Sequence, residues 1–216
     1  MSSRTVLRIV RGAVPLLGHD PFMTVTRDHP AGPTARAARP QHQGVGRSSS
    51  PAAEAVSDDL RRGAGSFLEQ RRRVAGLSLL SSAALGVVAL YQYGLLRRVP
   101  EPDLPGLDAD RVDASGEAYS FLSTPDASIG LVSYGTTLAL AGMGARNRAQ
   151  QQPWLPLLLA AKVGLDTVGA LTLTAEQATK HRKLCSWCTV SAFATLAMVP
   201  QVLPEARAAL RTLRGR

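Results

Sequence analysis

Residues 74–96, VAGLSLLSSAALGVVALYQYGLL, form an unbroken run of 23 residues without a charged side chain. A helix rises about 1.5 Å per residue, so about 20 apolar residues can cross the hydrocarbon core of a bilayer. Arginines flank the run, at 71–73 on one side and at 97–98 on the other. Because a surface helix of a soluble domain would carry a polar face, this run predicts a membrane span.

Three further apolar runs follow, at residues 127–144, 153–175 and 184–203. The first connection is about 30 residues long and the other two have fewer than ten, so the short ones join antiparallel neighbours. At the start of the second run, Thr124 can cap the helix, Pro125 suits its first position and Asp126 its first turn. Pro200 and Pro204 are expected to end the fourth run. The sequence therefore predicts an all-α, integral membrane four-helix bundle.

The segments outside the bundle are basic. Residues 1–70 are rich in Arg, Pro, Gly and Ser, so we expect a disordered or weakly structured N-terminal extension. Residues 71–210 form the predicted membrane domain, and residues 205–216 a basic tail. A net charge of +9 can indicate nucleic-acid binding. Aromatic residues make up only 5% of the chain and no binding motif occurs, so no nucleic-acid partner is expected.

The distribution of Lys and Arg predicts the orientation of the helices. Arginines cluster before the first run, between the second and third, and after the fourth: Arg61, Arg62, Arg71–Arg73, Arg146, Arg148, and four in the tail. These segments are expected in the cytoplasm, which places both termini there in a multi-pass cell (inner) membrane. The acidic connection at residues 97–126 is expected outside, together with residues 174–184, although the latter are locally basic.

The only two cysteines, Cys185 and Cys188, open the fourth run within HRKLCSWCTVS. Residues three apart share one face of a helix, so the two sulfurs can approach for a disulfide. A helix N-terminus and nearby positive charge, here Arg182 and Lys183, favour a thiolate. We expect Cys185 in the first turn at the outer surface and Cys188 one turn deeper. This arrangement predicts a redox-active pair.

Two other interpretations of the thiols remain open. Cysteines in an apolar helix can be small buried hydrophobes. A structural zinc site needs four ligands, and none beyond His181 and the two cysteines lies nearby in the sequence, so we expect no metal.

Lys162 and Asp166 interrupt the third run with an i,i+4 spacing typical of a neutralised pair. They could alternatively form a proton route or a polar wall of a binding site.

With a C-x-x-C at the start of its fourth predicted helix, the chain resembles the vitamin K epoxide reductase family over residues 72–210. The most specific stretches are LCSWCTVSAFATLAMVPQVLPEAR and STPDASIGLVSYG. The resemblance implies a bundle around a quinone, menaquinone or ubiquinone, with Cys185 meeting a thiol partner and Cys188 facing the quinone. It places Asp126 where many members have an Asn that binds a quinone carbonyl. Ala192 stands where animal members have a tyrosine.

The chain departs from this family in the loop between its first two predicted membrane helices. Members typically carry a second cysteine pair there, whereas residues 103–126 contain no cysteine. A thioredoxin-like protein or a small thiol would then have to reach Cys185 directly. We predict a membrane thiol–quinone oxidoreductase, and the alternative is a non-catalytic membrane protein of the same fold with a structural cysteine pair. A transporter is disfavoured because no inverted repeat is visible.

Overall fold

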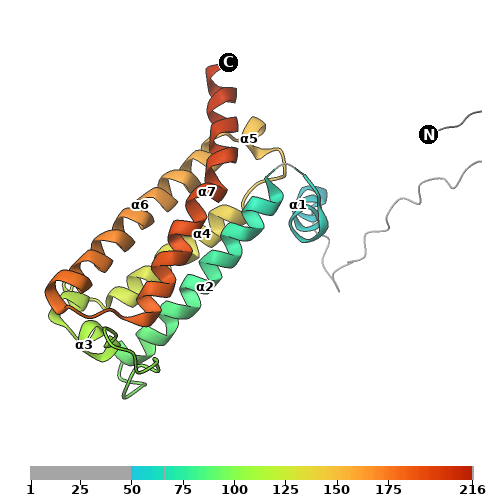
Figure 1. Ribbon diagram of the computed structural model, residues 1–216. Coiled ribbons are helices and arrows are strands. Elements are labelled where there is room, and N and C mark those ends of the chain that lie inside the picture. Colours follow the sequence, from blue (N-terminus) through green and yellow to red (C-terminus); the bar gives the residue numbers. More distant parts are fainter. Residues whose placement is uncertain (1–49, 66, 216) are drawn as a thin grey trace, which may run out of the picture. The chain divides into compact units, whose positions relative to one another are not determined.

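The computed structural model describes residues 50–65 and 67–215. Four long helices make up most of them: α2 (Leu68–Gln92), α4 (Asp126–Gly142), α6 (Trp154–Glu176) and α7 (Ser186–Arg214). Figure 1 shows these helices packed side by side. An isolated bridge between Leu107 and Leu184 is the only β-type pairing in the described residues, so the all-α prediction is confirmed.

Part of the predicted disordered extension forms a helix. Helix α1 (Pro51–Arg62) begins behind Ser50, whose hydroxyl accepts a hydrogen bond from the Ala53 amide at 3.2 Å. The expectation of little structure is therefore wrong for this segment, because a capping serine followed by proline starts a helix. Residues 1–49 of the predicted extension lie outside the described residues.

Helix α2 is shifted from its predicted bounds of 74–96. It begins at Leu68 and includes the arginines expected to flank it. Tertiary contacts explain this shift, because Arg71 is buried. Its guanidinium donates hydrogen bonds to the carbonyls of Ala141 and of residues 142–145, at the end of α4. The helix ends at Gln92, just before Gly94 takes a positive φ of 74° that glycine tolerates.

Helix α7 continues well beyond its predicted end at residue 203. It runs through Pro200 and Pro204 to Arg214, so the prediction that these prolines end it is wrong, and residues 205–214 of the predicted tail are helical. A proline removes one backbone hydrogen bond, but the buried stripe of α7 continues past both prolines through Met198, Val202 and Ala206. Packing of this stripe outweighs the lost bond.

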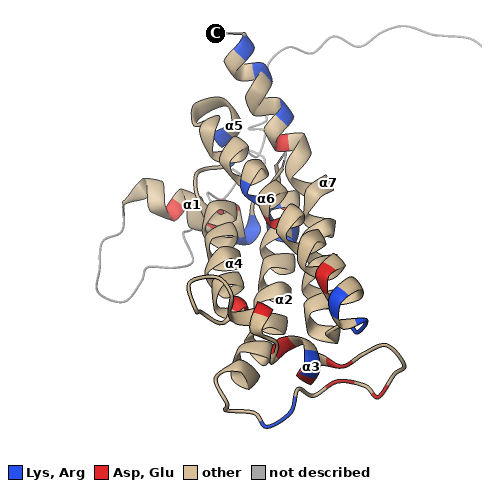
Figure 2. Cartoon of the chain, turned by 90° about the vertical axis from the view of Figure 1, so that its left-hand side faces the viewer, with Lys and Arg blue, Asp and Glu red and all other residues tan. Residues whose placement is uncertain are grey.

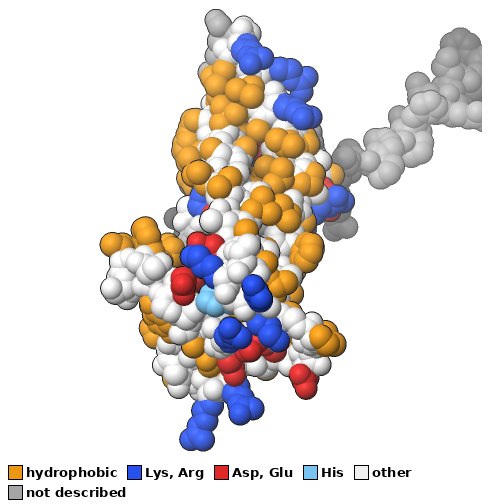
Figure 3. Space-filling model, turned by 60° about the vertical axis from the view of Figure 1, so that its left-hand side comes forward, with side chains coloured by type: hydrophobic (Ala, Val, Ile, Leu, Met, Phe, Trp, Pro, Cys, Tyr) orange, Lys and Arg blue, Asp and Glu red, His pale blue; other side chains and the backbone are white. Residues whose placement is uncertain are grey.

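Three helices of the described part of the chain are long and apolar enough to cross a membrane: α2, α7, and α6 with the π-helical turn η2 (Gln177–His181) that follows it. Helix α4 is shorter, with 17 residues. Figure 3 shows a face on which hydrophobic side chains cover much of the long helices. Large apolar side chains such as Leu165, Val168 and Phe193 are 64–71% exposed, which suits a lipid environment.

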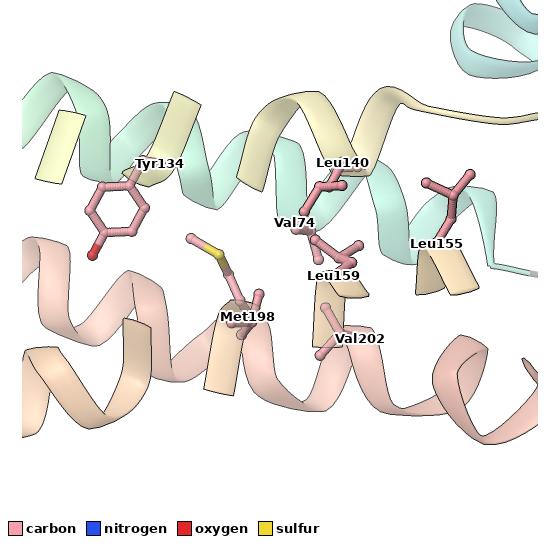
Figure 4. Packing of buried hydrophobic residues seen from close by; sticks show 9 residues of the cluster. Val74, Tyr134, Leu140, Leu155, Leu159, Met198 and Val202 are labelled. Carbon is pink, nitrogen blue, oxygen red and sulfur yellow. The ribbon is translucent and has the colours of Figure 1, made fainter. Parts of the chain in front are cut away.

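The interior is divided into two hydrophobic clusters. One lies between the long helices and includes Tyr134, Leu159 and Met198 (Figure 4). The other lies at the end of the bundle where α7 begins and includes Val88, Val112 and Cys185. Since Val112 belongs to the connection between α2 and α4, this second cluster attaches that connection to the thiol pair.

The connection between α2 and α4 folds back over the start of α7. It contains α3 (Ala109–Asp113) and the 3-10 turn η1 (Gly116–Tyr119), and Asp108 caps α3 by accepting from the Arg111 amide at 3.0 Å. The Asp108 amide donates to the Leu184 carbonyl at 3.1 Å, and the Leu184 amide donates to the Gly106 carbonyl at 2.9 Å. These bonds hold α3 against the residue that precedes Cys185.

Candidate active site

The two thiols lie at the N-terminus of α7. Cys185 is the N-cap residue, and its Sγ accepts a hydrogen bond from the Cys188 amide at 3.2 Å. Both cysteines are free thiols, and their sulfurs lie within 4.8 Å of each other. Cys185 is fully buried whereas Cys188 is half-buried. The α2–α4 connection covers Cys185, and its expected position at the outer side of the membrane stays a prediction.

The start of α7 is held by two other segments, η2 and the α2–α4 connection. The Cys185 amide donates to Gln177 Oε1 at 3.1 Å, and the Ser186 amide donates to Glu101 Oε2 at 3.3 Å. Trp187 Nε1 donates to the Pro100 carbonyl at 2.7 Å. The free amides of the helix start are thus satisfied by the loop and by the end of α6, which fixes the position of the thiols.

Asp113 is a site residue that sequence reasoning missed. Its side chain is only 1% exposed, and Cys188 Sγ donates a hydrogen bond to its Oδ1 at 3.6 Å. Its Oδ2 has no hydrogen-bond partner among the described residues. Burial raises the pKa of Asp113 to about 6, and the neighbouring carboxyl of Asp126 adds to this effect. No local pattern in the acidic connection marks this residue, since only the fold brings it to the thiols.

Asp113, Cys185 and Cys188 offer three possible metal-ligand atoms within 4.8 Å of one another. Structural zinc sites are almost always four-coordinate, so three donors fall one short of a closed site. The expectation that the thiols bind no metal stays a prediction.

Arg182 and Lys183 form no hydrogen bond with the thiols in the described residues. No hydrogen bond or ion pair joins either side chain to another described residue, and Arg182 is exposed with a left-handed φ of 53° between η2 and α7. The charged group in contact with Cys188 is instead the acidic Asp113. Stabilisation of a thiolate by these two cations stays a prediction without a supporting contact.

A cavity of about 380 Å³ lies beside the thiol pair. Its wall includes Cys188 and Ala192 from α7, Asp126 and Tyr134 from α4, and Asp166 from α6. Phe121 and neighbouring loop residues line it at the end near the α2–α4 connection. The volume falls in the range of about 300–1,000 Å³ typical of small-molecule sites, and a few polar groups converge in it.

Asp126 begins α4 as predicted and lines the cavity. The predicted cap is wrong, because the Thr124 hydroxyl donates to the Leu122 carbonyl and Pro125 occupies the N-cap position. The side chain of Gln92, which belongs to α2, caps α4 instead. Its Nε2 donates to Asp126 Oδ1 at 2.7 Å, and its Oε1 accepts from the Ala127 amide at 3.3 Å. Asp126 is thereby held in the same cavity wall as Cys188.

Lys162 and Asp166 form the predicted ion pair, with Nζ at 2.6 Å from both carboxylate oxygens. Ser133 and Thr137 of α4 also donate to this carboxylate, at 2.8 and 3.2 Å. Asp166 and Ser133 line the cavity, whereas Lys162 is not among its lining residues. The pair therefore links α6 to α4 at the cavity wall, and its role beyond this link stays a prediction.

Tyr134 is a second residue that sequence reasoning missed. Its ring is buried, it lines the cavity, and its hydroxyl lies 2.6 Å from Thr195 Oγ1 and accepts from Ser191 Oγ at 3.0 Å. Ala192, where the resemblance implies that a tyrosine is missing, also lines the cavity but carries no hydroxyl. A lone tyrosine within the small and apolar α4 run was the signal that could have identified Tyr134.

The family model described as the vitamin K epoxide reductase family matches residues 73–203. The chain belongs to the vitamin K epoxide reductase family. Comparisons with curated proteins and with solved structures return no match. The region matched to the vitamin K epoxide reductase family contains both thiols and every cavity-lining residue named above. Membership in this family, together with three helices able to cross a bilayer, identifies a membrane protein.

Proposed function

We propose that the protein is a membrane oxidoreductase that exchanges electrons between thiols and a quinone through Cys185 and Cys188. The proposal rests on the position of Cys188, which lies beside both Cys185 and the cavity. Its sulfur lies within 4.8 Å of Cys185 Sγ, and its side chain lines the cavity. Oxidation of two thiols to a disulfide releases two electrons and two protons, and reduction of a quinone to a quinol takes up the same number.

The cavity suits a quinone ring as substrate. Apolar side chains such as Leu85, Ile129 and Leu173 contribute to its wall, and Asp126 and Tyr134 add polar groups. A donor near a quinone carbonyl stabilises the negative charge that develops on its oxygen. The Tyr134 hydroxyl is already bonded to Thr195 Oγ1 and Ser191 Oγ, and Asp126 can donate only in its protonated form. Menaquinone and ubiquinone are both candidate substrates.

The thiol partner would have to reach a covered site. Cys185 is buried beneath the segment that contains α3, and residues 93–125 contain no cysteine to relay electrons. Thiol–disulfide exchange requires attack of a thiolate on a disulfide sulfur. We infer that a small thiol or a thioredoxin-like protein reacts either at the more exposed Cys188 or at Cys185 after this segment has moved.

The proposed topology has four spans in the cell (inner) membrane, with the thiols at the outer side and both termini in the cytoplasm. Helix α4 would be the fourth span, although its 17 residues extend only about 26 Å. Figure 2 shows Lys and Arg on the last turns of α7, which supports a cytoplasmic C-terminus, and both acidic and basic residues around α3. Reporters fused after Leu122 and after Arg216 should lie on opposite sides of the membrane. The same side for both would contradict the topology.

The function can be tested with the reduced protein in detergent. Menaquinone or ubiquinone is added without other oxidant, quinol is measured by absorbance, and disulfide is measured by loss of alkylatable thiols. We expect one quinol per disulfide formed. Cys185→Ser and Cys188→Ser should abolish both signals. Ser186→Ala is the matched control, since Ser186 Oγ has no hydrogen-bond partner among the described residues and carries no redox chemistry.

The alternative function is that of a non-catalytic membrane protein with structural cysteines. It is favoured by the complete burial of Cys185 and by its role as helix cap. Under this alternative neither quinone oxidises the thiols, and Cys185→Ser lowers thermal stability without any catalytic effect. Quinol formation that survives in Cys188→Ser would also contradict the proposed enzyme.

A further inference from the structure

We propose that Asp113 is the proton acceptor and donor of the Cys188 thiol and therefore a third catalytic residue of the site. This inference rests on the proposed function and deepens it. The second cysteine pair typical of the family is absent from residues 103–126, and the same connection instead supplies a buried carboxyl to the remaining pair. Asp113 is the residue of this connection that accepts a hydrogen bond from the reacting sulfur.

The geometry favours proton transfer over a purely structural contact. Cys188 Sγ donates to Asp113 Oδ1 at 3.6 Å, and the ligand atoms of Asp113, Cys185 and Cys188 all lie within 4.8 Å of one another. Asp113 Oδ2 has no hydrogen-bond partner among the described residues, although the side chain is buried. A buried carboxylate in a structural role would normally be fully hydrogen-bonded. The Asp113 carboxylate instead accepts its hydrogen bond from a thiol, which is a weak donor.

Among the described residues, no Lys or Arg forms a hydrogen bond or ion pair with Asp113. The titratable groups that interact with it come from four segments: Tyr91 of α2, Glu101 of the connection, Asp126 of α4, and Cys185 and Cys188 of α7. No Lys or Arg is among these groups. A carboxyl surrounded by other acids and thiols holds a proton more readily than one paired with a cation. The site therefore keeps Asp113 able to exchange a proton near neutral pH.

The proposed step moves one proton and no electrons. The S–H bond of Cys188 breaks, an O–H bond forms on Asp113 Oδ1, and the sulfur becomes the thiolate that reacts. When the dithiol is oxidised, the electron pair passes to the quinone as the bond between the two sulfurs forms. Asp113 then loses its proton to water. The two protons released by the thiols equal the two taken up by the quinol, and the reverse direction uses the same transfer.

The pKa of about 6 for Asp113 agrees with this role. Proton transfer by a side chain is most effective when its pKa lies near the working pH. An ordinary aspartate, with a pKa near 3.9, would be a weaker base. Burial raises the pKa of Asp113 towards neutral pH while leaving most of the carboxyl ionised at pH 7.

The test compares wild type with Asp113→Asn, Asp113→Glu and the control Asp103→Asn. Asp103 is an exposed carboxylate of the same connection, without a hydrogen bond or ion pair to any described residue. Two quantities are measured: quinone-coupled turnover, and the rate of Cys188 alkylation without quinone, resolved by mass spectrometry. Because general acid–base groups contribute about 100-fold or more, Asp113→Asn should lower turnover by that factor. Asp113→Glu should retain part of the activity, and Asp103→Asn all of it.

The rate of Cys188 alkylation should rise in Asp113→Asn, whereas its turnover should fall. Removal of the negative charge of Asp113 favours the Cys188 thiolate, so Asp113→Asn should be alkylated faster than wild type at pH 7. Slower alkylation together with slower turnover would indicate a disrupted site and overturn the proposal. Turnover in wild type should also fall below a pH of about 6, where Asp113 becomes protonated, and this decline should be absent in Asp113→Asn.

The outcomes separate this inference from the function on which it rests. Wild-type turnover that is unchanged in Asp113→Asn overturns the proton role alone and leaves the oxidoreductase intact. Absence of quinone-coupled turnover in wild type contradicts the oxidoreductase, and the proton role with it. Stoichiometric zinc in the purified protein that is lost in Asp113→Asn would overturn the proposal in favour of a metal site.

Discussion

Arg148 and Glu205 form a bidentate ion pair in the interior, with guanidinium Nε and Nη2 at 2.8 and 2.7 Å from the two carboxylate oxygens. Both side chains are almost completely buried. Arg148 Nη1 also donates to the carbonyls of Leu140 and Met143 at 2.7 Å. The pair thus joins α5 (Arg148–Gln151) to the end of α4 and to α7, on the side of the bundle away from the thiols.

Loss of one partner of this pair should destabilise the fold. Glu205→Ala leaves the Arg148 guanidinium buried without its carboxylate, which costs about 3–5 kcal/mol in comparable pairs. The measurement is thermal unfolding of the purified protein in detergent. The double variant Arg148→Met/Glu205→Leu should recover much of the loss, because it leaves no buried charge. A Glu205→Ala protein as stable as wild type would contradict the importance of the pair.

The Lys162–Asp166 pair should behave as a mutually neutralised link. Asp166→Asn leaves a largely buried ammonium without its counter-charge, so we expect a loss of about 1–3 kcal/mol in thermal unfolding. The swap Lys162→Asp/Asp166→Lys should restore most of it. The exposed pair Lys180–Glu176 has the same i,i+4 spacing and provides the control. Glu176→Gln should cost less than about 0.5 kcal/mol. A destabilising swap would show that the orientation of the pair matters.

The sequence predicts most of this fold because the long helices are apolar over most of their length. Apolar runs locate α2, α4, α6 and α7 without reference to tertiary structure. The ends of α2 and α7 were mispredicted because tertiary contacts decide them. Arg71 is tolerated in a helix because the carbonyls at the end of α4 accept its hydrogen bonds, and Pro204 because its neighbours on the buried stripe remain packed.

Only those site residues that belong to a recognisable sequence pattern could be predicted. Spacing identified the Cys185–Cys188 pair and the ion pair in α6, and family resemblance pointed to Asp126. Asp113 could not be identified, since it lies 75 residues before Cys188 in a connection without periodic pattern. Its contact with the thiol depends on the bonds that attach the connection to Leu184. Such contacts arise from folding of the connection and leave no local signature.

Asp126 should affect quinone binding through hydrogen bonding rather than charge. Asp126→Leu removes the polar group from the cavity wall, and loss of one hydrogen bond of about 0.5–1.5 kcal/mol should raise the quinone KM about 2- to 10-fold. Asp126→Asn can still donate to a carbonyl, so its KM should equal that of wild type or be lower. Ser128→Ala is the control, since Ser128 bonds Tyr93 and is not among the cavity-lining residues. Equal KM values for Asp126→Leu and wild type would exclude the contact.

Asp113 should also make stability depend on pH. Its pKa is raised from 3.8 to about 6 by burial, so the folded state holds this proton more tightly than the unfolded state. The resulting stabilisation is complete below a pH of about 4 and is lost as the pH rises through 6. At pH 8 the charged carboxylate therefore costs about 3 kcal/mol relative to the neutral form, at 1.36 kcal/mol per pKa unit.

Asp113→Asn removes this cost while retaining a side chain of the same shape. The variant should unfold at a higher temperature than wild type at pH 8 and at nearly the same temperature at pH 4, measured in the same detergent. Asp103→Asn, which removes an exposed charge from the same connection, should show no such divergence. An Asp113→Asn protein that is less stable than wild type at pH 8 would mean that the carboxylate is stabilised by its surroundings. The pKa of Asp113 would then not be raised in the folded protein.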